Sequence, residues 1–253
     1  MGIISIIPIT GLPIIKEGDD IVGMMESCLG SMGETVEDGD VFVIASTIIS
    51  KQEGQLHDLR DIEPTGEAKE LSLKTGKDPR LCELIIRSSE KILKVGEGPI
   101  ISLTKQGFIC ASAGIDTSNI AGDKNIVATL PQNPDDSAVH IREELEARHD
   151  KRVAVIISDT QGRPFRAGAI GVCVGLSGIE PFVAYRGKKD LYGYELRASV
   201  IGRADEIASA ADIAMGQSDE GFPVIIVRGA NFIYSDDAKA TGFIREREKD
   251  LFR

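Results

Sequence analysis

The chain has 253 residues, with 29 Lys or Arg and 40 Asp or Glu, which gives a formal net charge of −11. This acidic balance excludes the basic surface that general nucleic-acid binding needs, although backbone N–H groups or metal ions can still attract an anionic nucleotide. Apolar residues make up 42% of the chain, but no apolar run approaches the roughly 20 residues of a membrane span.

In the first part of the chain, apolar runs predict strands at Ile3–Ile9 and Val41–Ala45, and the pattern between them predicts a helix over Asp19–Gly30. Near-helical spacing of apolar residues extends over 66–95, with a break at Asp78-Pro79.

The second part continues this mixture, with predicted strands at Pro99–Leu103, Phe108–Ala111, Arg152–Ser158, Gly168–Gly178 and Val224–Val227, and predicted helices from Asp135 to Arg148 and over Arg203–Met215. Because strands and helices alternate without a regular βαβ period, the order favours an α+β fold. We expect a non-Rossmann, irregular mixed sheet with flanking helices. No linker or internal repeat appears, so residues 1–253 are predicted to form a single domain.

The four cysteines, Cys28, Cys82, Cys110 and Cys173, lie in apolar or helical patterns and none has CxxC spacing. They are interpreted as reduced core thiols, and the three histidines form no zinc-binding motif. The N-terminus shows no basic leader, so no signal peptide is predicted. We therefore expect a cytoplasmic protein without a membrane segment.

The common nucleotide-binding signatures are missing, since the sequence contains neither GxxxxGK[ST] nor GxGxxG after a strand. Polar residues instead follow the apolar strands. Asp116 and Asp159 each come directly after such a run, where a carboxylate can bind a hard divalent cation or simply cap a turn.

Other polar positions leave similar alternatives open. Ser46, Thr47 and Lys51 suit a phosphate site or a solvated loop. Arg163 and Arg166 flank a turn and suit phosphate, carboxylate or a surface ion pair. Considered by itself, the segment Gly216–Gly221 is typical of an ordinary helix C-terminus, where a glycine ends the helix.

Taken together, several segments resemble the coenzyme F420-0:L-glutamate ligase family. In family order they are ITGLPIIKEGDD (9–20), DGDVFVIASTIISKQEG (38–54), SAGIDTSNI (112–120), VIISDTQGRPFRAGAIG (155–171), GKKDLYGYEL (187–196), ADEIASAADIAMGQ (204–217) and VRGAN (227–231). The resemblance implies an enzyme that uses GTP and divalent metal to join L-glutamate successively, through γ-linkages, to the deazaflavin precursor F420-0. It also implies an intertwined homodimer.

The resemblance carries roles to individual residues. It implies that two divalent cations, Mg²⁺ or Mn²⁺, are held by Asp116, Asp159, Thr160 and Gln217, and a monovalent cation is a further candidate. It implies nucleotide contacts from Gly11, Leu12, Pro13, Ile14, Ser46, Thr47, Lys51, Asn119, Met215, Gly216, Gln217, Ser218, Asp219, Glu220, Gly221 and Phe222. Because Gln217 is a neutral amide, the ion it binds should be the looser of the two. The acidic loop around Asp219 should meet the nucleotide mainly through backbone N–H groups.

The implied chemistry begins with phosphorylation of the substrate carboxylate by GTP, followed by attack of the glutamate amine on the acyl phosphate. Positioning and charge neutralisation should dominate the first step. Lys51, Arg163 and Arg166 are the catalytic candidates for stabilising the transferred phosphate, and no side chain is an evident general base. Two alternatives remain: a non-catalytic GTP-binding regulatory module, and a related amide ligase acting on another acid.

Overall fold

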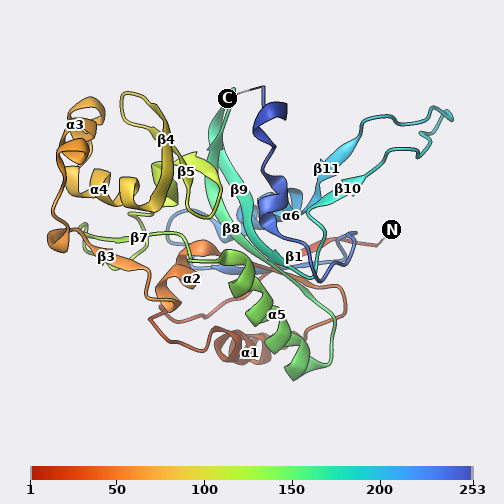
Figure 1. Cartoon of the computed structure of the whole chain (residues 1–253). Coiled ribbons are helices and arrows are strands. Elements are labelled where there is room, and N and C mark those ends of the chain that lie inside the picture. The colour runs from red at the N-terminus through yellow and green to blue at the C-terminus, as the bar shows by residue number, and fades with distance from the viewer. Residues whose placement is uncertain (1, 252–253) are drawn as a thin grey trace.

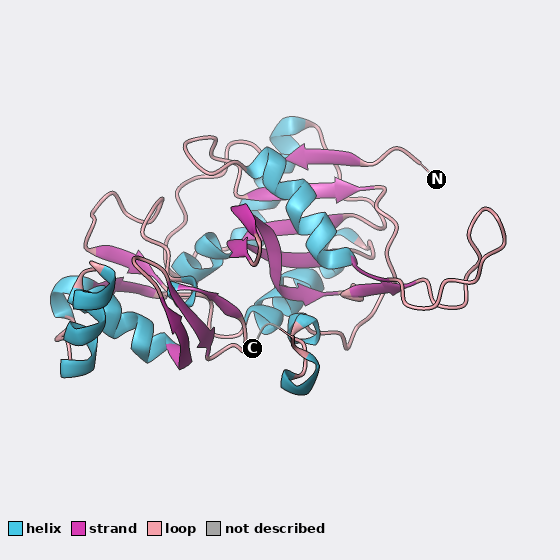
Figure 2. Ribbon diagram, turned by 90° about the horizontal axis from the view of Figure 1, so that it is seen from above, coloured by secondary structure: helices cyan, strands magenta, loops and turns pink. Residues whose placement is uncertain are grey.

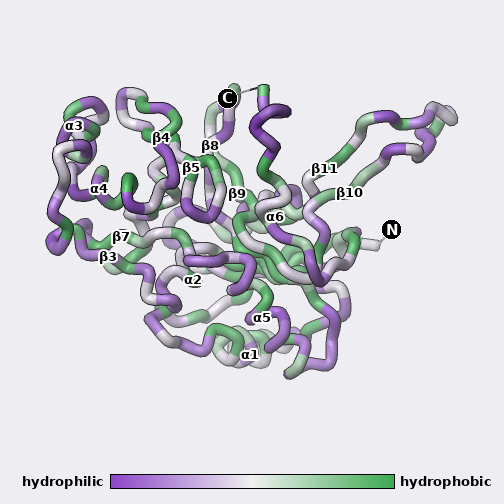
Figure 3. The backbone as a smooth tube through the Cα atoms, in the orientation of Figure 1, coloured by the Kyte–Doolittle hydropathy of each residue, from purple (hydrophilic) through white to green (hydrophobic). Residues whose placement is uncertain are grey.

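Short apolar runs form a central five-stranded sheet in the computed structural model, which describes residues 2–251 (Figure 1). The strand order is β1-β12-β2-β8-β9. Strands β2 and β8 run parallel, and the other neighbouring pairs are antiparallel. The strands are β1 (Ser5–Pro8), β12 (Val224–Arg228), β2 (Val41–Ala45), β8 (Ala154–Arg163) and β9 (Arg166–Ser177). The green, hydrophobic stretches of the tube in Figure 3 follow these strands.

Helices cover both faces of this sheet. Helices α1 (Ile21–Met32) and α5 (Pro134–His149) lie below it in Figure 1, and α6 (Arg203–Met215) lies above. Two glycines of β9 permit close packing. A Cβ at Gly175 would lie 2.4 Å from the Pro134 carbonyl oxygen, and one at Gly171 would lie 2.8 Å from the Ala208 carbonyl oxygen. Neither position could carry a side chain without moving a helix.

A smaller lobe stands beside the main sheet (Figure 2). It contains two small apolar clusters of its own. Its elements are β3 (Leu56–Asp58), α3 (Gly66–Thr75), α4 (Pro79–Ser88), β4 (Ser89–Val95), β5 (Ile100–Thr104), β6 (Ile109–Ala111) and β7 (Ile126–Ala128). Strands β4, β5 and β6 form one sheet, and β3 pairs with β7.

An extended arm leaves the main body between β10 (Phe182–Ala184) and β11 (Val200–Gly202) (Figure 1). Leu191 and Tyr192, near its tip, are almost fully exposed. Four short 3₁₀ segments complete the described secondary structure: Leu59–Asp61, Ser112–Gly114, Ala240–Phe243 and Arg247–Lys249. No helix within residues 2–251 is long and apolar enough to cross a membrane.

The prediction of an α+β fold with a mixed sheet is confirmed, and all four cysteines are free and buried. Helical structure throughout 66–95 is wrong, because β4 replaces the last predicted turns. The backbone of Ser89–Val95 pairs with β5, and this pairing overrides the helical spacing of its side chains. A solvated loop was one of two alternatives for Ser46, Thr47 and Lys51, and it is wrong, because Ser46–Gln52 form helix α2 with Ser46 and Lys51 buried.

Candidate functional site

Two parallel strands bring polar side chains to one edge of the central sheet. Ala45 at the end of β2 is the register partner of Ser158 on β8, so Ser46 and Asp159 emerge side by side. The Ser46 hydroxyl donates to Asp159 Oδ1 at 3.5 Å, and Gln161 Nε2 donates to Asp159 Oδ2 at 2.9 Å. Asp159 is thus held at a fixed position inside β8. Sequence reasoning ended this strand at Ser158, but pairing with β9 carries it on to Arg163, and Asp159 is the last buried residue of its buried half.

A left-handed turn delivers the second carboxylate from the smaller lobe. Ser112, Ala113 and Gly114 have φ values of 51°, 56° and 67°. Consecutive left-handed residues carry strain unless the surroundings hold them. Asp116 follows this turn and exchanges two backbone hydrogen bonds with Ala128, at 2.9 and 3.0 Å. Thr47 Oγ1 donates to Asp116 Oδ2 at 2.7 Å, which ties the carboxylate to helix α2.

Asp159 is buried and Asp116 is half-buried, and neither carboxylate has a basic partner among the described residues. Burial, followed by the negative charge of Asp159, raises the pKa of Asp116 to about 6, and burial also raises the pKa of Asp159. Among the described residues, no Lys or Arg forms an ion pair with either group. Uncompensated buried carboxylates are costly, and a bound dication would remove that cost.

This donor set fits hard divalent cations only when neutral oxygens or substrate phosphates complete it. Within residues 2–251, no cluster of three or more His, Cys, Asp or Glu side chains could hold a metal by itself. The Thr160 hydroxyl and the Gln217 amide lie near each other, since Gln217 Nε2 donates to Thr160 Oγ1 at 2.9 Å. Carboxylate, hydroxyl and amide oxygens together are the ligand types that Mg²⁺ and Mn²⁺ accept.

A chain of hydrogen bonds joins the loops on the two sides of the site. Lys51 Nζ donates to the Asn119 carbonyl oxygen at 2.6 Å, and Asn119 Nδ2 donates to the Ser218 carbonyl oxygen at 2.9 Å. Asn119 adopts a left-handed φ of 56° to make this link. Burial lowers the pKa of Lys51. In this structure the Lys51 ammonium positions the Asn119 loop.

In the loop after α6, the side chain of Glu220 accepts a hydrogen bond from the loop's own backbone. Gly216 turns the chain with φ 72°, and a Cβ there would lie 2.2 Å from the Glu220 carboxyl carbon. The Glu220 carboxylate accepts the Ser218 backbone N–H at 2.8 Å. Hydrogen bonds from backbone N–H groups, that of Ser218 first, lower the pKa of Glu220. The N–H groups expected to meet a nucleotide are therefore partly occupied by Glu220.

These segments enclose a cavity of about 540 Å³ at the sheet edge. Its lining includes almost all of the predicted site residues: Leu12, Pro13, Ile14, Ser46, Thr47, Lys51, Asp116, Asn119, Asp159, Thr160 and 215–222. Residues from five separate parts of the sequence thus converge on one space. A cavity of this size can hold a nucleotide-sized ligand.

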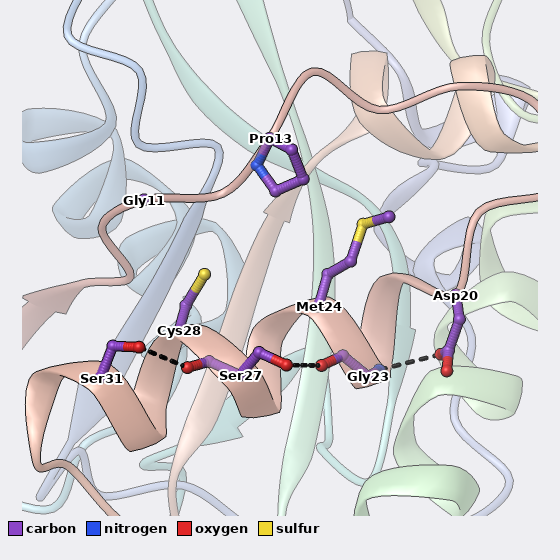
Figure 4. A pocket seen from close by; sticks show the side chains of 8 residues that line it. All are labelled: Gly11, Pro13, Asp20, Gly23, Met24, Ser27, Cys28 and Ser31. Carbon is purple, nitrogen blue, oxygen red and sulfur yellow. Dashed lines mark hydrogen bonds between the residues drawn. The ribbon is translucent and has the colours of Figure 1, made fainter.

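Three predicted residues lie elsewhere. Gly11 lines a second, more open hollow of about 660 Å³ between the 11–13 segment and α1, with Ser27 and Asp20 (Figure 4). Arg163 and Arg166 face each other in register where β8 turns into β9, and Arg163 Nη1 donates to the Gly168 carbonyl oxygen at 3.0 Å. The structure does not bring these two arginines to the cavity of their own chain.

Sequence reasoning missed two polar neighbours of the predicted ligands, Gln161 and Asp212. Asp212 Oδ1 accepts hydrogen bonds from Gln217 Nε2 at 2.8 Å and from Thr160 Oγ1 at 3.4 Å. In the sequence Asp212 belongs to the helical segment ASAADIAM, where a polar residue reads as a solvated helix position. Only the packing of α6 on β9 reveals its neighbours.

Comparison with known proteins places the whole site inside one family. The model of the F420-0:Gamma-glutamyl ligase family matches residues 10–229. The chain belongs to this family. Every candidate site residue, from Gly11 to Phe222, lies within the matched range.

Curated relatives agree with this assignment over nearly full length. A coenzyme F420:L-glutamate ligase of Methanothermobacter thermautotrophicus is 45% identical over 251 residues, which cover 99% of each chain. Its counterpart from Methanocaldococcus jannaschii is 47% identical over 242 residues, or 96% of this chain and 94% of the relative. The protein of that name from Archaeoglobus fulgidus is 38% identical over 251 residues, covering 99% and 96%.

Proposed function

We propose that this chain is a GTP-dependent ligase that adds L-glutamate successively to coenzyme F420-0 through γ-linkages. Family membership and the names of its relatives support the substrates. The observation that carries the proposal is a pair of carboxylates without an ion-pair partner among the described residues, half-buried Asp116 and buried Asp159, in a cavity at the sheet edge. An acidic cavity of this kind suits a metal-bound triphosphate better than a free anion.

The reaction needs an activated carboxylate, because a free carboxylate would have to expel oxide. Transfer of the GTP γ-phosphate to the F420-0 carboxylate gives an acyl phosphate and GDP. The glutamate α-amine then attacks the acyl carbon, the amide C–N bond forms and inorganic phosphate leaves. The chain's own part is to align these groups and exclude water.

Asp116, Asp159, Thr160 and Gln217 are the residues that would hold the two divalent cations. When bound, such ions neutralise phosphate charge and so reduce repulsion between the triphosphate and the substrate carboxylate. Ser46, Thr47 and the 215–222 loop would contact the nucleotide, since they line the same cavity. No side chain of the cavity is an obvious base for the amine, so a substrate or phosphate oxygen is proposed to take that proton.

The three basic candidates differ in whether they lie close enough to the cavity to act in catalysis. Lys51 lies in the cavity wall, and it would need to exchange the Asn119 carbonyl for a phosphate oxygen to act on the transferred group. Arg163 and Arg166 lie on the β8–β9 hairpin outside this cavity. Any catalytic role for these two arginines would therefore require movement of the hairpin or a site shared between subunits.

One incubation tests the proposed activity. The protein is mixed with GTP, Mg²⁺ or Mn²⁺, L-glutamate and F420-0, and product mass and GDP are measured together. We expect mass additions of whole glutamate residues and GDP release only when both the acid and the amine are present. Slow GTP hydrolysis independent of both substrates would favour a regulatory GTP-binding module, and GDP release with a different acid would favour a related amide ligase. Equal rates with ATP would remove the guanine preference.

We also propose that the protein is a homodimer. The extended arm between β10 and β11 exposes Leu191 and Tyr192, and Tyr194 is also largely exposed. Apolar side chains on a projecting segment are commonly covered by a partner. Light scattering at micromolar concentration should give twice the 27.2 kDa chain mass. A fully active monomer would contradict the dimer.

A further inference from the structure

Asp212 lies behind the cavity wall, in the last turn of α6, where it is half-buried. Its position follows from close packing. Gly171 on β9 lacks a side chain, and a Cβ there would lie only 2.9 Å from the Asp212 Cβ. The register partner of Gly171 on β8 is Thr160. The helix therefore presents Asp212 to Thr160 through the gap that glycine leaves.

The three polar side chains at this point form a closed set of hydrogen bonds. Gln217 Nε2 donates to Asp212 Oδ1 at 2.8 Å and to Thr160 Oγ1 at 2.9 Å, and Thr160 Oγ1 donates to the same Asp212 oxygen at 3.4 Å. An ionised carboxylate can only accept, so these donor directions are fixed. The Gln217 nitrogen and the Thr160 proton are both directed at Asp212.

The consequence is a defined orientation of the remaining oxygen lone pairs. With its nitrogen held by Asp212, the planar Gln217 amide leaves Oε1 free on its other branch. The Thr160 hydroxyl donates its only proton to Asp212, and one of its two lone pairs accepts from Gln217, so the other lone pair is left for a cation. Both residues line the cavity, whereas Asp212 is not among the lining residues. Without a carboxylate behind them, the amide could turn its N–H groups, and the hydroxyl its proton, toward a cation.

We propose that Asp212 is a positioning residue that orients the Gln217 amide and the Thr160 hydroxyl, so that both present oxygen to the second divalent cation. The inference rests on the proposed function, which assigns that ion to Thr160 and Gln217. Asp212 acts through these two side chains and is assigned no contact with the ion, because it does not line the cavity and its Oδ1 already accepts from both. Residues that hold metal ligands in this way typically change metal affinity 10- to 100-fold when they are mutated.

Mn²⁺ binding separates this role from a general effect on folding. Free Mn²⁺ is counted by electron paramagnetic resonance during titration of the whole protein, with a non-hydrolysable GTP analogue present. The variants are Asp212→Ala, which removes the acceptor, and Asp212→Asn, which keeps one acceptor oxygen. Glu206→Gln is the control, because it removes an exposed carboxylate of the same helix, whose ion-pair partner is Arg203 at 3.4 Å.

We expect two ions on the wild-type protein and on Glu206→Gln. In Asp212→Ala the first ion should bind normally and the second should bind about 10- to 100-fold more weakly. Asp212→Asn should recover part of that loss. Two ions of wild-type affinity in Asp212→Ala would overturn the inference, and so would equal weakening of both ions together with a lower melting temperature. Fewer than two ions on the wild-type protein would overturn the two-ion proposal itself, and with it this role.

Discussion

Two acidic regions lie at opposite ends of strand β2. At the start of β2, Asp40 is fully buried and receives two hydrogen bonds from Arg228, from Nε at 2.8 Å and from Nη2 at 2.9 Å. Beyond the other end of β2, Asp159 on β8 lies near Asp116, and neither forms an ion pair with Lys or Arg among the described residues. The first region carries its own cation, and the second has an environment that favours binding one.

This difference helps to distinguish a carboxylate that stabilises the fold from a carboxylate pair that binds a cation. A buried charge is normally paired, and pairing a carboxylate with arginine is a structural solution that leaves little for a ligand to do. An unpaired cluster keeps a cost in the folded protein that only protonation or an added cation can remove. This contrast makes the two ends of the sheet respond in opposite ways to mutation, pH and metal.

The largest expected effect is on activity at the unpaired end. Asp116→Asn or Asp159→Asn should lower ligation roughly a thousandfold or more, because each removes one of the two carboxylates proposed to hold the divalent cations. The metal-free Asp116→Asn protein should melt at or above the wild-type temperature at pH 7, since a buried charge is lost. Turnover and thermal melting are measured together.

Asp150→Asn provides the matched control for these variants, because Asp150 is exposed after α5 in a left-handed conformation that Asn tolerates. It should change neither turnover nor melting. Wild-type turnover in Asp116→Asn or Asp159→Asn would contradict the ligand assignment.

At the paired end, Arg228→Met should destabilise the fold by about 3 kcal/mol, because Asp40 would remain buried without its cation. Turnover per folded molecule should stay unchanged. The surface pair of Lys151 and Asp38, at 3.4 Å, serves as the control, and Lys151→Met should cost less than about 1 kcal/mol. Urea unfolding measures both variants. Adding Asp40→Asn to Arg228→Met should recover part of the loss, and an additive further loss would contradict the pairing argument.

The pH response should also distinguish the two ends. Since the pKa of Asp116 is raised from 3.8 to about 6 in the folded protein, the folded state binds more protons than the unfolded state between these values. The stability of the metal-free protein should therefore fall as pH rises through this window, by up to about 3 kcal/mol. Above pH 6 the ionised pair should bind metal, so added Mn²⁺ should raise the melting temperature more at pH 7 than at pH 5.

Other carboxyl groups titrate in the same window, so the comparison is made against Asp116→Asn. The difference in unfolding free energy between wild type and this variant should change with pH, and it should level off above pH 6. If this difference stays constant from pH 4 to pH 7, the pKa of Asp116 is not raised in the folded protein. The charges of Asp116 and Asp159 then do not destabilise the metal-free protein.

Much of the fold followed from local sequence patterns, and the exceptions have physical reasons. Apolar runs predicted the central strands because a strand that is buried on both faces is apolar along nearly its whole length. The segment after Ser88 has apolar residues at helical spacing, yet it forms strand β4 because its backbone pairs with β5. Local periodicity cannot predict such a pairing between separate segments.

The convergence of Asp116 and Asp159 on one cavity could be predicted only in part. Their places after apolar runs marked both as candidates, but Asp159 lies inside β8, and Asp116 follows the 3₁₀ segment Ser112–Gly114 and not a strand. Asp212 was not predictable, because its significance depends on Gly171 and Thr160 lying beneath α6. The positions of Arg163 and Arg166 away from the cavity likewise depend on how far the β8–β9 hairpin extends, and residue type alone does not give that length.

The smallest expected effect concerns the loop that closes the unpaired end. Glu220 occupies the Ser218 N–H with its own carboxylate, at 2.8 Å, so an incoming phosphate must compete with a resident anion. Glu220→Gln replaces that anion with a weaker neutral acceptor and should tighten GTP binding a few-fold. Asp219→Asn removes the same charge from the neighbouring exposed residue, but it leaves the Glu220 hydrogen bond in place. Isothermal titration with GTP and Mg²⁺ compares the two variants with wild type. Stronger binding in Glu220→Gln than in Asp219→Asn would assign the gain to release of the backbone N–H group. Equal gains would mean that only the net charge of the loop matters, and the anion-exchange interpretation of Glu220 would be wrong.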